Sequence, residues 1–96
     1  MMRGMDAELV QRSKRQYADG LVEIVIWRVP IPIEPSLHRF KYRLVYVVAG
    51  VRVVGYDNER GKGDHRHSGA LELPYQFVSL TSMLTDFWHD VERSGK

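Results

Sequence analysis

A period of two runs through residues 40–48, and this alternation constrains the fold more than any other feature. One set of alternate positions is apolar or aromatic, namely Phe40, Tyr42, Leu44, Tyr46 and Val48. The intervening set starts with cations and consists of Arg39, Lys41, Arg43, Val45 and Val47. Because successive side chains of a strand point to opposite faces, the segment predicts a strand with one buried face. Ala49-Gly50 then predicts a turn into another strand over residues 52–56.

A hairpin is predicted ahead of this strand. Asp19-Gly20 is a strong turn signal between residues 8–18 and the Val- and Ile-rich residues 21–29. Residues 6–9 would also tolerate a helical start. Three prolines follow, and because proline lacks a backbone donor and disrupts regular structure, residues 30–36 are predicted to form an extended connector.

The C-terminal part has a helical period. Its apolar positions recur every three or four residues and are Leu80, Met83, Leu84, Phe87, Trp88 and Val91. Ser79 is the predicted N-cap of this amphipathic helix. We therefore predict an α+β fold, in which an antiparallel sheet of about four strands carries the C-terminal helix on one face.

Composition narrows the class of protein. The chain has 96 residues, no cysteine and a net charge of +2. This length suits one domain over residues 1–96, and without cysteine there are no disulfides or thiolate metal sites. The first ten residues have no apolar core, so they do not resemble a signal peptide, and no apolar run approaches the roughly 20 residues of a membrane helix. We expect a cytoplasmic protein that does not associate with a membrane.

Positive charge is concentrated in the middle of the chain. Residues 38–67 contain seven Lys and Arg side chains and three carboxylates, a net charge of +4. A sheet face that carries Arg39, Lys41 and Arg43 can attract phosphate or an acidic partner. The alternative is a solvated sheet face with no ligand.

Residues 56–67, YDNERGKGDHRH, combine acidic, basic and amide side chains with two glycines. They begin where the predicted strand over residues 52–56 ends. Together with Gly69, the two glycines predict a loop or a sharply bent ribbon, and functional residues are often placed on such segments. The segment is the candidate functional site.

The chemistry of this segment suits cleavage of RNA without a metal. We expect His65 and His67 to act as acid and base, with Asp64 or Asp57 orienting one of them. The expected substrate contacts are the neighbouring cationic, amide and aromatic side chains, Lys62, Arg66, Arg60, Asn58, Tyr56, Arg43 and Lys41. The alternative is a turn that caps its own backbone and leaves its histidines in solvent.

A metal is a weaker interpretation of the two histidines. A His-x-His pair without a third histidine or a cysteine nearby is a poor zinc signature, and Lys62 and Arg66 would repel the ion. We therefore expect no metal and no other cofactor. The other two histidines, His38 and His89, are expected to be structural or solvated.

The sequence closely resembles the TumE family, the toxin half of a bacterial type II toxin–antitoxin pair. The similarity is carried by YRLVYVVAGVRVVGYDNERGKGDHRHSG over residues 42–69, by PYQF over residues 74–77 and by DFWHDV over residues 86–91. It extends to residues 25–27 and the proline-rich connector. The resemblance implies a small cytoplasmic bacterial toxin with a helix-turn-helix antitoxin as its partner, and it assigns no catalytic residue.

Three functions are compatible with these features. The leading hypothesis is a toxin that acts on RNA as a small metal-independent ribonuclease. The alternative is a non-catalytic binding module that docks a partner protein or a nucleic acid through the basic sheet face. A nucleotidyl or other group transferase comes last, because the chain has no recognisable carboxylate pair motif and no phosphate-binding loop.

Overall fold

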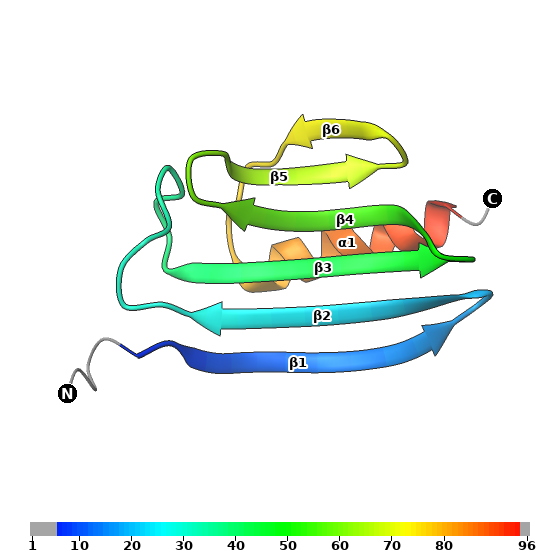
Figure 1. The fold of residues 1–96 in the computed structure, drawn as a ribbon, viewed down its shortest axis with the longest axis horizontal. Coiled ribbons are helices and arrows are strands. Elements are labelled where there is room, and N and C mark those ends of the chain that lie inside the picture. The colour runs from blue at the N-terminus through cyan, green and yellow to red at the C-terminus, as the bar shows by residue number, and fades with distance from the viewer. Residues whose placement is uncertain (1–5, 95–96) are drawn as a thin grey trace.

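The computed structural model describes residues 6–94, in which six antiparallel strands and one helix form two layers (Figure 1). The elements are β1 (Glu8–Tyr17), β2 (Gly20–Arg28), β3 (Phe40–Val48), β4 (Val51–Glu59), β5 (Gly63–Ser68), β6 (Leu71–Pro74) and α1 (Leu80–Ser94). Each strand pairs with the next one along the chain, so the sheet order is β1-β2-β3-β4-β5-β6. The α+β class, the antiparallel sheet and the C-terminal helix are confirmed.

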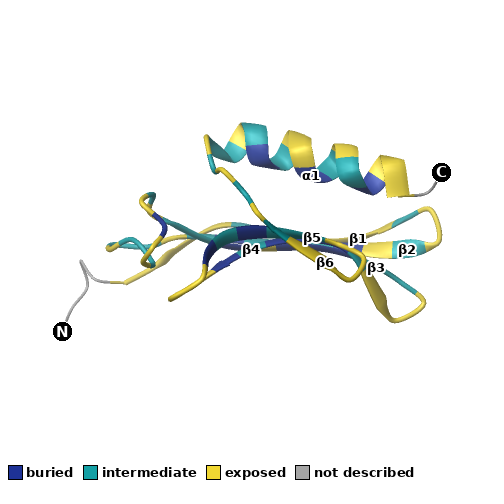
Figure 2. Ribbon diagram, turned by 90° about the horizontal axis from the view of Figure 1, so that it is seen from above, coloured by how far each residue is buried: buried dark blue, intermediate teal, exposed yellow. Residues whose placement is uncertain are grey.

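Helix α1 lies across one face of the sheet, which we call the helix face (Figure 2). The core fills the space between these two layers and consists of Val22, Ile24, Ile26, Tyr42, Leu44, Tyr46, Val54, Tyr56, Met83, Phe87 and Val91. The opposite face, which we call the open face, is covered by no helix in the described part of the chain. One face therefore makes the core, and the other is left uncovered by α1.

The first four strands follow the predicted pattern. The segment that could have begun as a helix is strand β1, and it pairs with β2 through a turn at Ala18 and Asp19, one position before the predicted dipeptide. Ala49 and Gly50 form the turn between β3 and β4, where both have positive φ angles of 51° and 79°. Two successive positive φ angles are typical of the tight turns that match the twist of a hairpin.

The prediction of about four strands is wrong, because β5 and β6 extend the sheet to six among the described residues. Of the two forms predicted around the glycines of residues 56–67, the structure shows the sharply bent ribbon and not the loop. The first residues of this segment are the end of β4, its last residues are in β5, and only residues 60–62 form a turn. Gly61 and Gly63 have φ angles of 88° and 78°, so these glycines close a hairpin. Strand β5 has no apolar alternation, and β6 ends in a proline, so neither has the usual sequence signal of a strand.

The helix begins as predicted. The Ser79 side chain accepts a hydrogen bond from the backbone N–H of Ser82 at 3.0 Å, which satisfies a donor of the first turn. Met83, Phe87 and Val91 are buried against the sheet, with Leu80, Leu84 and Trp88 packed around them. None of the helical structure in residues 6–94 is long and apolar enough to cross a membrane.

Candidate functional site

The register of β3, β4 and β5 places the central residues of the candidate site on the open face. Asp57 pairs with Arg43 of β3 on one side and with His65 of β5 on the other. His67 pairs with Gly55, two positions along the same strands. Since positions two apart share a face, Asp57, His65 and His67 converge on one side of the sheet.

His65 is held at both ring nitrogens, and its side chain is 6% exposed. Its Nδ1 atom lies 3.0 Å from the Gly63 carbonyl oxygen, which can only accept, so Nδ1 carries a proton and donates it. Its Nε2 atom lies 2.7 Å from Asp57 Oδ1 and 3.5 Å from Glu72 Oε2. The Nε2 atom therefore faces two carboxylates, one from β4 and one from β6.

Asp57 Oδ1 is buried and accepts no hydrogen bond from any residue in the range 6–94. The 2.7 Å separation from His65 Nε2 is that of an ion pair, but the pair does not have the alignment of a hydrogen bond. A buried carboxylate oxygen that accepts no hydrogen bond costs free energy of folding, so such an atom in a native structure often has a functional role. This oxygen lies between the two histidines, 2.7 Å from His65 Nε2 and 3.9 Å from His67 Nε2.

His67 is bound differently from His65. Arg52 NH2 lies 3.0 Å from His67 Nδ1, and because a guanidinium only donates, Nδ1 is the acceptor and the proton of the neutral ring is on Nε2. Burial lowers the pKa of His67 from its usual value of 6.5, and the Arg52 charge lowers it further. The two rings are thus held differently, since Nδ1 of His65 donates to a backbone carbonyl whereas Nδ1 of His67 accepts from Arg52.

Gly55 makes the contact between Arg52 and His67 possible. A Cβ atom at residue 55 would lie 2.9 Å from Arg52 Cδ and 3.6 Å from His67 Cδ2. The absence of a side chain at this position therefore lets the arginine cross the strand to reach the histidine.

Lys62 and Glu72 border the cluster. Lys62 Nζ lies 3.0 Å from Glu72 Oε2, and this contact raises the pKa of Lys62 and lowers that of Glu72. Both side chains are well exposed, at 51% and 41%. Because an exposed ion pair of this kind is weak, an incoming phosphate can compete for the lysine.

Asp64 is on the helix face and does not contact His65 or His67. Its carboxylate accepts from Ser36 Oγ at 2.5 Å and from Tyr42 OH at 2.5 Å, and His38 Nε2 donates to it at 2.7 Å. His38 Nδ1 accepts from the Phe40 backbone N–H at 3.1 Å, which places the ring proton on Nε2. This buried network fixes the connector to β5, and His38 has the structural role that we expected.

Three more of the predicted residues also point to the helix face. Asn58 is fully buried, accepts from the Tyr42 backbone N–H at 3.1 Å and donates to the Phe40 carbonyl at 2.7 Å. Tyr56 OH donates to Asp90 Oδ2 at 2.6 Å, and Arg66 NH1 donates to the same oxygen at 3.2 Å. These side chains join the sheet to the connector and to α1, away from the histidine cluster.

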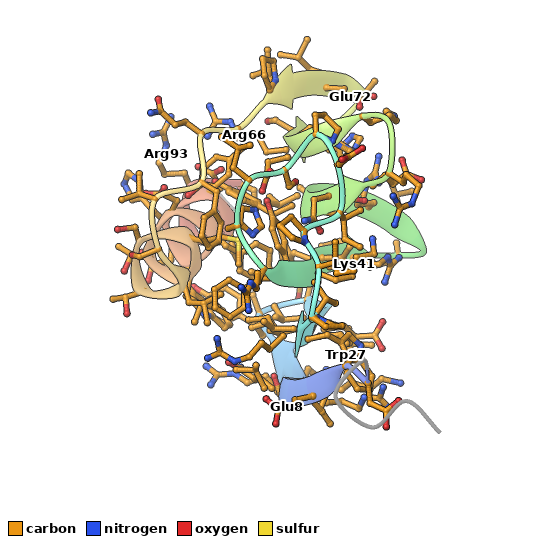
Figure 3. The ribbon with its side chains drawn as sticks, turned by 90° about the vertical axis from the view of Figure 1, so that its left-hand side faces the viewer. Glu8, Trp27, Lys41, Arg66, Glu72 and Arg93 are labelled. Atoms are coloured by element: carbon orange, nitrogen blue, oxygen red, sulfur yellow. The ribbon has the colours of Figure 1, made fainter. Side chains whose placement is uncertain are left out.

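The remaining predicted residues are nearer to the cluster. Lys41 points to the side away from α1, as do Trp27 and Glu72, whereas Arg66 is on the side of the helix (Figure 3). Lys41 donates to the Asn58 carbonyl, and Arg43 is exposed next to Asp57 in the neighbouring strand. Arg60 is exposed in the turn between β4 and β5.

The same cluster also has the spacing of a set of metal ligands. Asp57, His65 and His67 offer three donor atoms within 4.8 Å of one another. While Arg52 donates to His67 Nδ1 the ring proton is on Nε2, so ligation through Nε2 would require Arg52 to move away. Arg52 and Lys62 are the cations near the cluster.

Sequence reasoning missed two residues of the site, Arg52 and Glu72. A glycine inside a strand indicates that another group approaches closely, so Gly55 was a signal for a neighbour such as Arg52. Glu72 approaches the cluster through the β5–β6 hairpin, in which it pairs with His67. No strand signal marks that hairpin.

Comparison with known proteins gives one result. A family model described as Toxin TumE matches residues 5–94, which is nearly the whole chain. No significant match was found among curated proteins or among solved structures. The match includes every residue of the open-face cluster and all six strands. The chain therefore belongs to the TumE toxin family.

Proposed function

We propose that this chain cleaves RNA by metal-independent acid–base catalysis at the open-face cluster of Asp57, His65 and His67. Membership of the TumE family makes it the toxin of a toxin–antitoxin system. The observation that carries the proposal is the pair of differently held histidines, one donating and one accepting at Nδ1, beside a carboxylate oxygen that accepts no hydrogen bond within residues 6–94. We also propose a helix-turn-helix antitoxin as its partner.

His67 is the base of the proposed reaction. Its lowered pKa keeps the ring neutral near pH 7, and its lone pair is on Nδ1. Arg52 covers that lone pair in the free protein. A phosphate is a stronger partner for a guanidinium than a neutral imidazole is, so substrate draws Arg52 away and exposes the base.

His65 is the acid. With Nδ1 held by the Gly63 carbonyl, the proton on Nε2 is the one available for transfer, and Asp57 stabilises the imidazolium. His67 takes the proton from a ribose 2′-hydroxyl as the bond from its oxygen to phosphorus forms. The bond from phosphorus to the 5′ oxygen breaks, and His65 protonates that oxygen. The products are a 2′,3′-cyclic phosphate and a 5′-hydroxyl.

Cations around the cluster supply the phosphate contacts. Arg52 and Arg43 are exposed on the open face, and Lys62 is exposed at the turn beside it. These side chains can stabilise the charge that develops on the phosphate oxygens. Tyr56, Asn58, Asp64 and Arg66 are assigned no catalytic role, because their side chains are committed to the helix face.

The test is cleavage of a labelled single-stranded RNA in buffer that contains EDTA. Wild-type protein should give products with cyclic phosphate ends, and His67→Ala should reduce the rate by at least about 100-fold. His89→Ala is the matched control, since His89 is exposed on α1, and it should cut at the wild-type rate. Intact RNA at high protein concentration, with and without added divalent metal, would overturn the proposal. Cleavage that needs the metal would overturn its metal-independent part.

A further inference from the structure

We propose that the open face of β1, β2 and β3 binds single-stranded RNA, with an unpaired base stacked on Trp27. This inference rests on the proposed function, because it extends the substrate away from the histidine cluster along the same face.

The register connects the two regions directly. Arg12, Val25, Arg43, Asp57 and His65 are consecutive partners across five strands, so they form one cross-strand row on the open face. Neighbouring strands are roughly 4.8 Å apart, so this row extends for about 19 Å. A strand of RNA that crosses the row passes from the cations of β1 and β3 to the histidines.

Trp27 lies in the adjacent row, between Leu9 and Lys41. Its side chain is partly exposed on the side away from α1 (Figure 3), and the Arg12 guanidinium lies 5.8 Å from the ring centroid. An indole with a cation above it and a second cation beside it offers a base a stacking surface and its phosphate two charges.

Charge favours a nucleic acid on this face. The open face of β1, β2 and β3 carries Arg12, Lys14, Lys41 and Arg43 against Glu23, a net charge of +3. Glu23 is 3.6 Å from Lys14, so the arginines lie outside that pair. Cations interleaved with an aromatic side chain are the usual composition of a surface that binds single strands.

Single-stranded RNA fits better than a duplex. The bases of a duplex are stacked on one another and cannot reach an indole, whereas the bases of a single strand can turn outward. An acidic protein surface could pair with the same cations, but its carboxylates would not stack on the Trp27 ring beside Arg12.

The test uses the His67→Ala protein in EDTA, so that RNA is bound and not cut, and measures fluorescence anisotropy of a short labelled strand. Trp27→Ala should weaken binding about ten-fold, and Arg12→Gln should weaken it and make the salt dependence less steep. Arg15→Gln is the matched control. It removes the same charge from the same strand, but Arg15 stacks on Trp88 on the helix face, so it should change affinity by less than about two-fold.

A second measurement does not depend on the stability of a Trp27 variant. The chain has two tryptophans, so in a Trp88→Phe protein the fluorescence comes from Trp27 and should be quenched by single-stranded RNA and not by a duplex. Unchanged Trp27 emission, or equal affinity of wild type and Trp27→Ala, would overturn the inference. Competition by polyglutamate that depends on Trp27 would assign the face to an acidic protein and also overturn it. RNA that binds in this manner to the wild type but is never cut would overturn the proposed function alone.

Discussion

Gly20 and Gly55 both lack room for a side chain, but different atoms fill the space around them. At Gly20 an added Cβ would lie 2.5 Å from the Val47 backbone oxygen, which cannot move without the strand. At Gly55 it would lie 2.9 Å from Arg52 Cδ, which belongs to a flexible and exposed side chain. The first glycine therefore serves the fold, and the second serves the site.

Gly20→Ala and Gly55→Ala are expected to separate stability from site geometry. The first should lower the free energy of unfolding by about 1–3 kcal/mol, because backbone atoms of β3 must shift. The second should cost less than about 1 kcal/mol, since only Arg52 has to move. Urea denaturation of both proteins measures the difference. A larger loss for Gly55→Ala than for Gly20→Ala would contradict this assignment.

His67 is predicted to titrate below its usual pKa, and Arg52 is part of the reason. Burial is the larger cause of the lowered pKa of His67, and the Arg52 charge is the next. The ring should therefore still be mostly neutral at pH 6.5. Arg52→Gln removes only the second cause. The pKa should therefore rise in this variant, although not beyond the effect of burial, and NMR titration of the His67 ring measures it. Lys14→Gln, which removes a cation paired with Glu23, should leave the His67 pKa unchanged.

The β4–β5 hairpin serves two purposes at element scale. Its open-face side chains form the histidine cluster, and its helix-face side chains fix the connector and α1. Asp64 links β5 to Ser36 and His38, which lie between β2 and β3, and to Tyr42 of β3. Its side chain is only 10% exposed, so these bonds are poorly replaced by water.

Asp64→Ala is expected to destabilise the fold by about 3 kcal/mol, because three donors lose a charged acceptor. Asp86→Ala is the matched control, since Asp86 accepts one exposed hydrogen bond from Tyr75, and it should cost under about 1 kcal/mol. Thermal and urea unfolding of the two proteins measure these costs. Equal costs would show that the Asp64 network is not a structural link.

The sequence predicted those elements whose signal is local. The alternation of β3, the turn at Ala49-Gly50 and the Ser79 cap each depend on neighbouring residues, and each agrees with the structure. Strands β5 and β6 owe their place to pairing with β4 and with each other, and their polar sequences gave no period to detect. The composition of residues 56–67 was enough to predict a candidate site. Which of its side chains lie on each face depends on the pairing of β4 with β5, and the sequence does not indicate that register.

The molecule has one sheet, and its core lies only on the side that α1 covers. Two of the largest fully buried side chains in this core are tyrosines. Tyr42 and Tyr56 are each 1% exposed, and their hydroxyl groups donate to Asp64 and Asp90. Burial, together with the bond to a carboxylate, raises the pKa of both tyrosines above the usual 10.0. These bonds require protonated hydroxyl groups, which links the stability of the whole fold to high pH.

Stability is therefore expected to fall in alkaline solution, and Tyr42 should account for part of the fall. A group whose pKa is raised in the folded state contributes its full stability below the unfolded pKa, near 10, and loses it as pH rises further. One such tyrosine lowers the free energy of unfolding by about 1.4 kcal/mol per pH unit above that value. Tyr42→Phe cannot ionise, so its free energy of unfolding, measured in urea from pH 8 to about pH 11, should decline less steeply than that of the wild type by about this amount. The variant starts from lower stability because Asp64 loses a donor, so the comparison is between slopes. Parallel curves would mean that Tyr42 ionises in the folded state as readily as in the unfolded chain.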